Sequence, residues 1–138
     1  MNNTIKKIVF VILSFIAMIS FHSCIKNKTT TDTIKPTIAI VEPTDMDTLI
    51  LSLEPEVHIE FTVSDNEGLH SLDVKLFDSS NVIKQQSTPN VTNQSSYAFH
   101  THYIPIGVTG LTWMKVIITA TDHSENIITK ELKVFIKP

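Results

Sequence analysis

Apolar and polar residues alternate with a period of two along much of this chain, and this alternation restricts its fold more than any other feature. The pattern is clearest in residues 56–64. The apolar side chains there are Val57, Ile59, Phe61 and Val63, and the polar ones are His58, Glu60, Thr62 and Ser64. Successive side chains of a β-strand point to opposite faces, so residues 56–64 are predicted to form a strand with one buried face.

Segments of the same kind recur and predict about seven strands in total. The other predicted strands are residues 37–41, 71–76, 81–86, 95–104, 111–122 and 126–136. Turn signals separate them, such as Gly68, which tolerates a positive φ, and Pro55 and Pro105, which stand between the apolar runs. Many short strands with no long helical period predict an all-β, immunoglobulin-like antiparallel β-sandwich.

The first 24 residues have the features of an export signal. Lys6 and Lys7 are followed by an apolar block at residues 8–19, which is too short to span a bilayer as a helix. Residues 21–24, Phe-His-Ser-Cys, resemble the lipobox of bacterial lipoproteins, in which the cysteine is acylated and the peptide is cut before it. We therefore expect a signal peptide at 1–23 and lipidation of Cys24. The alternative is an ordinary secretory signal or short anchor in which Cys24 is incidental.

The residues after the cysteine define the expected domain organisation. Residues 24–34 are polar and rich in threonine, which is typical of a flexible tether, and residues 35–138 form the predicted sandwich domain. Ile25 replaces the aspartate that retains lipoproteins in the inner membrane, which favours the outer membrane of the cell envelope. Cys24 is the only cysteine, so no disulfide can form within the chain.

The charge of the chain argues against nucleic-acid binding. The formal net charge is −3, and loss of the two lysines of the signal peptide takes it to −5. The sequence contains no arginine and therefore lacks the bidentate group that commonly contacts phosphates.

Two loop motifs carry a resemblance to a known kind of protein. Residues 63–69 (VSDNEGL) and 120–126 (ATDHSEN) resemble the ends of the second and sixth strands of bacterial immunoglobulin-like domains. With the lipobox, the chain resembles uncharacterised immunoglobulin-like lipoproteins that carry domains of unknown function. Glu125 stands where that pattern usually has glycine. The resemblance implies the fold and a location outside the cytoplasm, and it implies no reaction.

The same two loops supply a candidate metal site. In an immunoglobulin-type sandwich they lie at one end, so Asp65 and Glu67 are expected near Asp122, Glu125 and Asn126. Carboxylate and amide oxygens are ligands that calcium prefers, which makes calcium the candidate cofactor. The alternative is that the aspartates only accept hydrogen bonds from turn amides.

A second candidate site is built from histidines. His100 and His102 are two residues apart on a predicted strand and therefore project from one face, where a zinc or copper ion could bind them. Either His58 or His70 could supply a third ligand. The alternative is a solvated strand face that binds no metal.

Aromatic residues give a third, weaker candidate. Trp113, Tyr97 and Tyr103 could form a platform for sugar rings, but aromatic side chains of small sandwiches mostly fill the core, which we expect for Phe61 and Trp113 and also for Phe99. The sequence contains no nucleophile motif such as Gly-x-Ser-x-Gly, and a small sandwich without insertions has little wall to enclose a substrate.

We therefore expect a non-enzymatic envelope lipoprotein that is held to the membrane by its lipid. Its domain would bind a protein or a glycan or assist an outer-membrane assembly. The alternative is a metal-dependent binding module. Because the tether should enter beside Asp65 and Asp122, partner binding is expected at the opposite end, in loops 43–55 and 104–111.

Overall fold

Eight strands follow one another along residues 31–138, the part of the chain that the computed structural model describes. They are β1 (Thr37–Glu42), β2 (Asp47–Ile50), β3 (Val57–Ser64), β4 (Leu69–Asp78), β5 (Ile83–Ser87), β6 (Ser96–Tyr103), β7 (Thr112–Asp122) and β8 (Ile127–Lys137). None of the described residues belongs to a helix that could span a bilayer. The predicted signal peptide at residues 1–23 and the predicted lipidation at Cys24 lie outside the described residues.

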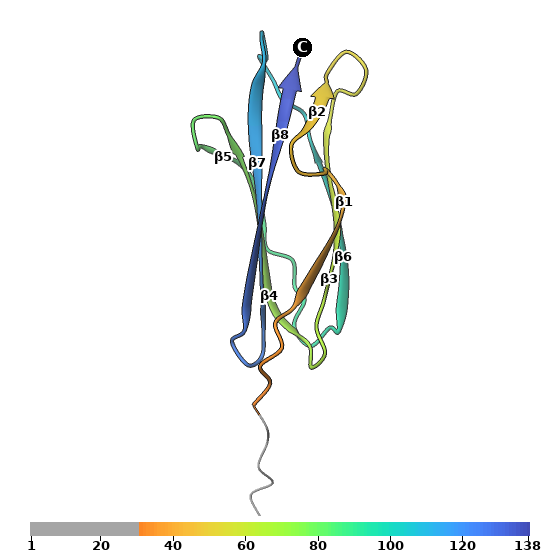
Figure 1. Cartoon of the computed structure of the whole chain (residues 1–138), viewed down its shortest axis with the longest axis vertical. Coiled ribbons are helices and arrows are strands. Elements are labelled where there is room, and N and C mark those ends of the chain that lie inside the picture. The colour runs from red at the N-terminus through yellow and green to blue at the C-terminus, as the bar shows by residue number, and fades with distance from the viewer. Residues whose placement is uncertain (1–30) are drawn as a thin grey trace, which may run out of the picture. The chain divides into compact units, whose positions relative to one another are not determined.

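The strands form two sheets that face each other (Figure 1). One sheet has the order β1-β3-β6, and the other has the order β2-β8-β7-β4-β5. This is the immunoglobulin arrangement. Strands β3 and β7, which correspond to the second and sixth strands of the seven-strand core, lie in different sheets, and the loops that follow them lie at the same end of the sandwich. The predicted immunoglobulin-like β-sandwich is confirmed.

Strand β2 is the part of the fold that the sequence pattern does not predict. It has four residues, of which only Leu49 is partly buried, so it lacks a period-two signal. It pairs in parallel with the end of β8, from Asp47 opposite Val134 to Ile50 opposite Lys137. The part of the chain that the structure describes therefore contains one parallel pair in an otherwise antiparallel sandwich, and it has eight strands rather than about seven.

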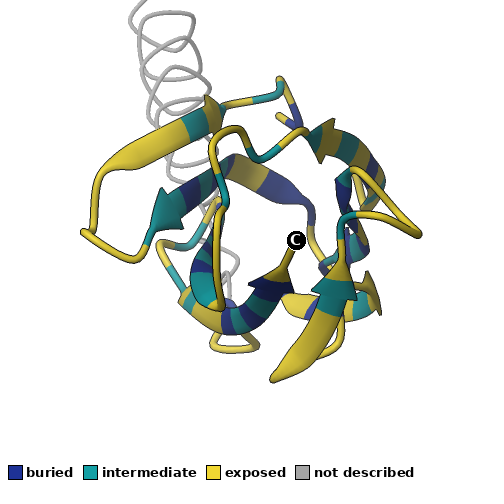
Figure 2. Ribbon diagram, turned by 90° about the horizontal axis from the view of Figure 1, so that it is seen from above, coloured by how far each residue is buried: buried dark blue, intermediate teal, exposed yellow. Residues whose placement is uncertain are grey.

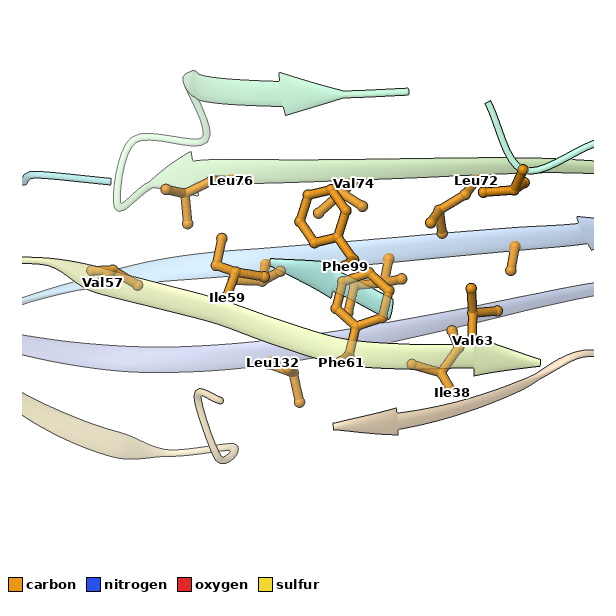
Figure 3. Packing of buried hydrophobic residues seen from close by; sticks show 14 of the residues in the cluster. Ile38, Val57, Ile59, Phe61, Val63, Leu72, Val74, Leu76, Phe99 and Leu132 are labelled. Carbon is orange, nitrogen blue, oxygen red and sulfur yellow. The ribbon is translucent and has the colours of Figure 1, made fainter. Parts of the chain in front are cut away.

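The core lies between the inner faces of the two sheets, and in Figure 2 dark stretches of buried residues alternate with more exposed residues along the strands. The apolar set of β3 is buried, with exposed fractions of 2% or less. Phe61 stacks on Phe99 of β6 with 5.0 Å between the ring centroids, and Leu72, Val74 and Leu76 of β4 lie across from them (Figure 3). The predicted faces of the strands are therefore correct in this region.

Trp113 departs from its predicted place in the core. It precedes the buried Met114 on β7, and alternation places it on the outer face of the five-stranded sheet, opposite Phe135 of β8. Lys133 covers both rings, with its Nζ 4.5 Å from the centroid of Trp113 and 5.4 Å from that of Phe135. Tyr97 and Tyr103 pack against the core instead, so the three residues form no common platform.

The compact unit begins at Thr31, four residues before the expected start of the domain at residue 35. In Figure 1 residues 31–36 leave the lower end of the sandwich, where the loops after β3 and β7 turn, and the chain ends at the opposite end. We call the lower end the base. It is the place where the end of the predicted tether meets the two acidic loops.

Candidate metal centre at the base of the sandwich

Three aspartates from separate parts of the chain meet at the base. Asp65 directly follows β3, Asp122 is the last residue of β7, and Asp32 precedes β1. Each is buried, with exposed fractions of 8%, 1% and 9% in that order. One carboxylate oxygen from each residue lies within 4.8 Å of those of the other two. We call these three residues the aspartate cluster.

Asp65 holds a tight turn and keeps one oxygen without a partner. Its Oδ1 accepts hydrogen bonds from the backbone N–H groups of Glu67, at 3.0 Å, and Gly68, at 2.8 Å. Gly68 has a φ of 115°, which explains why glycine is needed there. The Oδ2 atom is buried and has no hydrogen-bond partner among the described residues. A buried polar oxygen without a partner is costly, so Oδ2 is the atom of this turn at which a ligand would be favoured.

Asp122 is held more completely by the loop that follows it. Its Oδ1 accepts hydrogen bonds from the backbone N–H groups of Ser124 and Asn126, both at 2.8 Å, and its Oδ2 accepts one from the Asn126 side chain at 2.7 Å. Burial acts to raise the pKa of Asp122, but these hydrogen bonds outweigh it, and His123 adds to their effect, so the pKa lies below its ordinary value. The carboxylate is therefore kept ionised.

Asp32 ties the segment before β1 to both loops. Its Oδ1 accepts a hydrogen bond from the backbone N–H of Ile34 at 2.9 Å, and its Oδ2 accepts one from the Asn66 side chain at 3.2 Å. The Asn126 side chain donates to the Asp32 backbone carbonyl at 3.1 Å. The last residues of the predicted tether are thus part of the base.

The cluster has the charge and spacing of a calcium site. Within residues 31–138, none of the three aspartates forms an ion pair with a lysine. Carboxylates gathered this closely favour a cation between them, because like charges repel at short range. Oxygens that share one Ca²⁺ at about 2.3–2.6 Å lie at most about 5 Å apart, which the 4.8 Å limit of the cluster satisfies.

The five residues predicted for this site have different positions in the structure. Asp65 and Asp122 belong to the cluster, and Asn126 contacts it through an amide that donates hydrogen bonds. The side chains of Glu67 and Glu125 are exposed and lie outside it. The sequence pattern does not predict Asp32 as part of the site. It lies in a polar, threonine-rich segment with no strand period and no turn motif, so no local pattern indicates that its side chain is buried.

The histidines predicted as an alternative site lie elsewhere. His100 and His102 are on the outer face of β6, and His58 of β3 is directly opposite His102. His70 does not join them, because it is the second residue of β4, near the base, and its ring centroid lies 5.2 Å from that of His123. Of the two residues considered as a third ligand, the structure brings only His58 to the pair.

Comparisons with known proteins identify a family and a fold. A family model described as Domain of unknown function (DUF4625) matches residues 22–119. A search of curated proteins finds no match. Among solved structures, an engineered protein is 12% identical with a TM-score of 0.50. The match covers 75% of this chain, which spans only 20% of that protein.

Two other solved structures match with lower TM-scores. The CARDB domain of a Pyrococcus furiosus protein is 12% identical with a TM-score of 0.43, over 75% of this chain and 94% of that one. A Niemann-Pick type C2 protein from the Japanese carpenter ant is 10% identical with a TM-score of 0.42, over 75% and 90%.

Proposed function

The chain belongs to the family described as Domain of unknown function (DUF4625), and we propose that it is a non-enzymatic, lipid-anchored envelope protein whose sandwich domain is a binding module braced by calcium. The aspartate cluster carries this proposal. It combines three buried carboxylates within 4.8 Å with a buried oxygen of Asp65 that has no hydrogen-bond partner within residues 31–138. Hard oxygen ligands of this kind select Ca²⁺ over softer metals.

The ion would act as a brace because of where its ligands come from. Asp32 belongs to the segment that leads into the domain, whereas Asp65 follows a strand of one sheet and Asp122 ends a strand of the other. A cation shared by all three would hold the two sheets and the entering segment together at one point. Calcium would then fix the direction in which the domain leaves its tether, which a chain of flexible residues alone does not do.

Thermal unfolding of the full chain with and without Ca²⁺ tests the proposal. Binding to the native state alone stabilises it by about 2.7 kcal/mol at a free Ca²⁺ concentration of 100 times Kd. That gain corresponds to a rise in Tm of roughly 10–20 °C for a domain of this size. The rise should be reversed by a chelator, and its absence at millimolar Ca²⁺ would refute the brace.

Matched variants locate the ion. Asp65→Asn keeps an oxygen for the turn but removes the charge, so the Ca²⁺-dependent rise in Tm should disappear. Asp78→Asn is the control, because Asp78 accepts the same kind of turn hydrogen bonds, from Ser80 and Val82, outside the cluster. Glu67→Gln removes an exposed charge from the Asp65 loop and should keep the full rise. An equal loss in Glu67→Gln and Asp65→Asn would place the ion in the loops and not in the cluster.

The end opposite the base is the second part of the proposal, as the surface that contacts a protein partner. Loop 104–111 there borders a pocket of about 520 Å³ whose lining includes Ile106 and Leu111, with exposed fractions of 89% and 66%. Exposed apolar side chains around a hollow are typical of protein-binding surfaces. A photo-crosslinking residue at position 106 should trap a defined partner in intact cells. The same residue at Thr129 should trap none, and equal capture at both positions would contradict this assignment.

A further inference from the structure

Three histidines gather on the outer face of the three-stranded sheet, away from the aspartate cluster. His58 of β3 pairs in register with His102 of β6, and Glu60 pairs with His100. His100 and His102 are separated by one residue, so their side chains leave the same face of β6. Cross-strand pairing and alternation therefore bring all three imidazoles to one patch.

The rings form a nearly equilateral triangle. The ring centroids are 5.9 Å apart for His58 and His100, 6.3 Å for His58 and His102, and 6.4 Å for His100 and His102. Around a tetrahedral Zn²⁺ with Zn–N bonds of about 2.0–2.1 Å, the centroids of bound imidazoles lie about 5 Å apart. The nitrogens of the three rings do not all lie within 4.8 Å of one another, so binding requires each side chain to rotate its nitrogen toward the centre and each ring to move inward by about 0.6 Å.

A shared carboxylate lies beside two of the rings. Oε2 of Glu56 is 3.9 Å from Nε2 of His58 and 4.0 Å from Nε2 of His102. Oε1 of Glu54 is 3.9 Å from the same nitrogen of His58. The described residues place no lysine in an ion pair with either glutamate. The patch thus has imidazole ligands and a negative field that attracts a cation.

A second group of histidines, the pair His70 and His123, serves as a comparison for the triangle. His70 and His123 meet edge to face with 5.2 Å between ring centroids, and neither has a third imidazole or an ion-paired carboxylate beside it among the described residues. A ring contact of this kind needs no metal. The triangle differs because three rings lie within 6.4 Å of one another, centroid to centroid, and one carboxylate lies beside two of them.

We propose that His58, His100 and His102 bind one Zn²⁺ ion and that Glu56 completes or supports the site. Imidazole suits zinc, whereas the aspartate cluster offers only hard oxygen ligands, so the two sites select different metals. Three histidine ligands leave a fourth position for Glu56, water or a group from another molecule. The zinc site goes beyond the calcium brace and does not depend on it.

Zinc titration of the full chain, with Ca²⁺ at saturation, tests this site. Isothermal titration should give one Zn²⁺ per chain. His58→Ala and His102→Ala should each weaken binding at least tenfold, and Glu56→Gln should weaken it by roughly ten- to hundredfold if the carboxylate is a supporting group. His70→Ala is the matched control and should leave the affinity unchanged. All four positions are solvent-accessible, so Tm in a chelator should be the same for each variant.

The visible absorption of bound Co²⁺ is a second measurement. It would not change if the histidines only supported the fold and bound no metal. Co²⁺ bound in a tetrahedral site absorbs visible light much more strongly than aqueous Co²⁺, and the band should be lost in His58→Ala and kept in His70→Ala. Asp65→Asn should keep both the band and the zinc affinity. Loss of zinc binding in Asp65→Asn, or an equal loss in His70→Ala and His58→Ala, would overturn the proposal. Either result would leave the test of the calcium brace unaffected.

Discussion

Phe61→Ala is the substitution whose cost the structure specifies best. Phe61 is 1% exposed, lies on the inner face of β3 and stacks on Phe99 at 5.0 Å with 23° between the ring planes. Removing a buried phenylalanine costs about 3–5 kcal/mol, because the cavity closes only partly. The value should lie in the upper half of this range, since the stacked pair adds about 0.5–1.5 kcal/mol beyond its buried area. That is a large share of the roughly 5–15 kcal/mol that stabilises an ordinary domain.

Urea unfolding of the full chain in a chelator measures this cost without a contribution from metal. Glu60→Ala is the control, because the preceding residue is exposed on the opposite face and should change stability by less than about 0.5 kcal/mol. A double-mutant cycle with Phe99→Ala should return the coupling of the two rings, about 0.5–1.5 kcal/mol. A loss below about 1.5 kcal/mol for Phe61→Ala, or equal losses for the two neighbours, would refute the reasoning from burial.

Three other predictions concern separate features. Cys24→Ala should abolish fatty-acid labelling and release the chain from membranes, and undiminished labelling would contradict the lipid anchor. Glu125→Gly should raise the free energy of unfolding by about 0.5–1 kcal/mol, because Glu125 has a φ of 65°, and a decrease in a urea melt would show that its side chain is needed. Burial acts to raise the pKa of Asp73, but the hydrogen bonds from Lys75 and Gln86 and the charge of Lys75 lower it overall. The stability that this carboxylate adds is therefore present above its unfolded pKa and is lost as pH falls through its folded pKa. Asp73→Asn should therefore flatten the fall in stability below about pH 4, and an unchanged acid slope would contradict this.

The sequence predicts the strands that carry the buried core and misses β2, which adds only the partly buried Leu49 to it. β3 and β7 show a strict period of two because each has one buried face, and their predicted inner residues are buried. β2 is fixed by backbone pairing with β8 and by a single half-buried leucine, which leaves no pattern in its four residues. Trp113 shows the related error, because residue type suggested the core whereas its place in the alternation of β7 put it outside.

The candidate site could be predicted only where its residues are held by local structure. Asp65 and Asp122 each precede a turn that their own side chains stabilise, and that chemistry is visible in sequence. Asp32 reaches the same place through the path of the chain over the base, which no local pattern records. The choice of His58 over His70 likewise depends on the β3–β6 register, and register is a property of the folded pair.

The partial cover of β8 by β2 has a consequence for behaviour at high concentration. The ladder with β2 reaches only Val134 to Lys137, so residues 127–132 have no neighbouring strand on that side within the described part of the chain. A bare strand edge is a template for a strand of a second molecule. The exposed Lys130 and Glu131 lie in this stretch, and charges there oppose edge-to-edge association. β2 does not cover residues 127–132, so Lys130 and Glu131 are the groups that oppose pairing of this part of β8 with a second molecule. Replacing both with threonine should produce light scattering that grows with protein concentration.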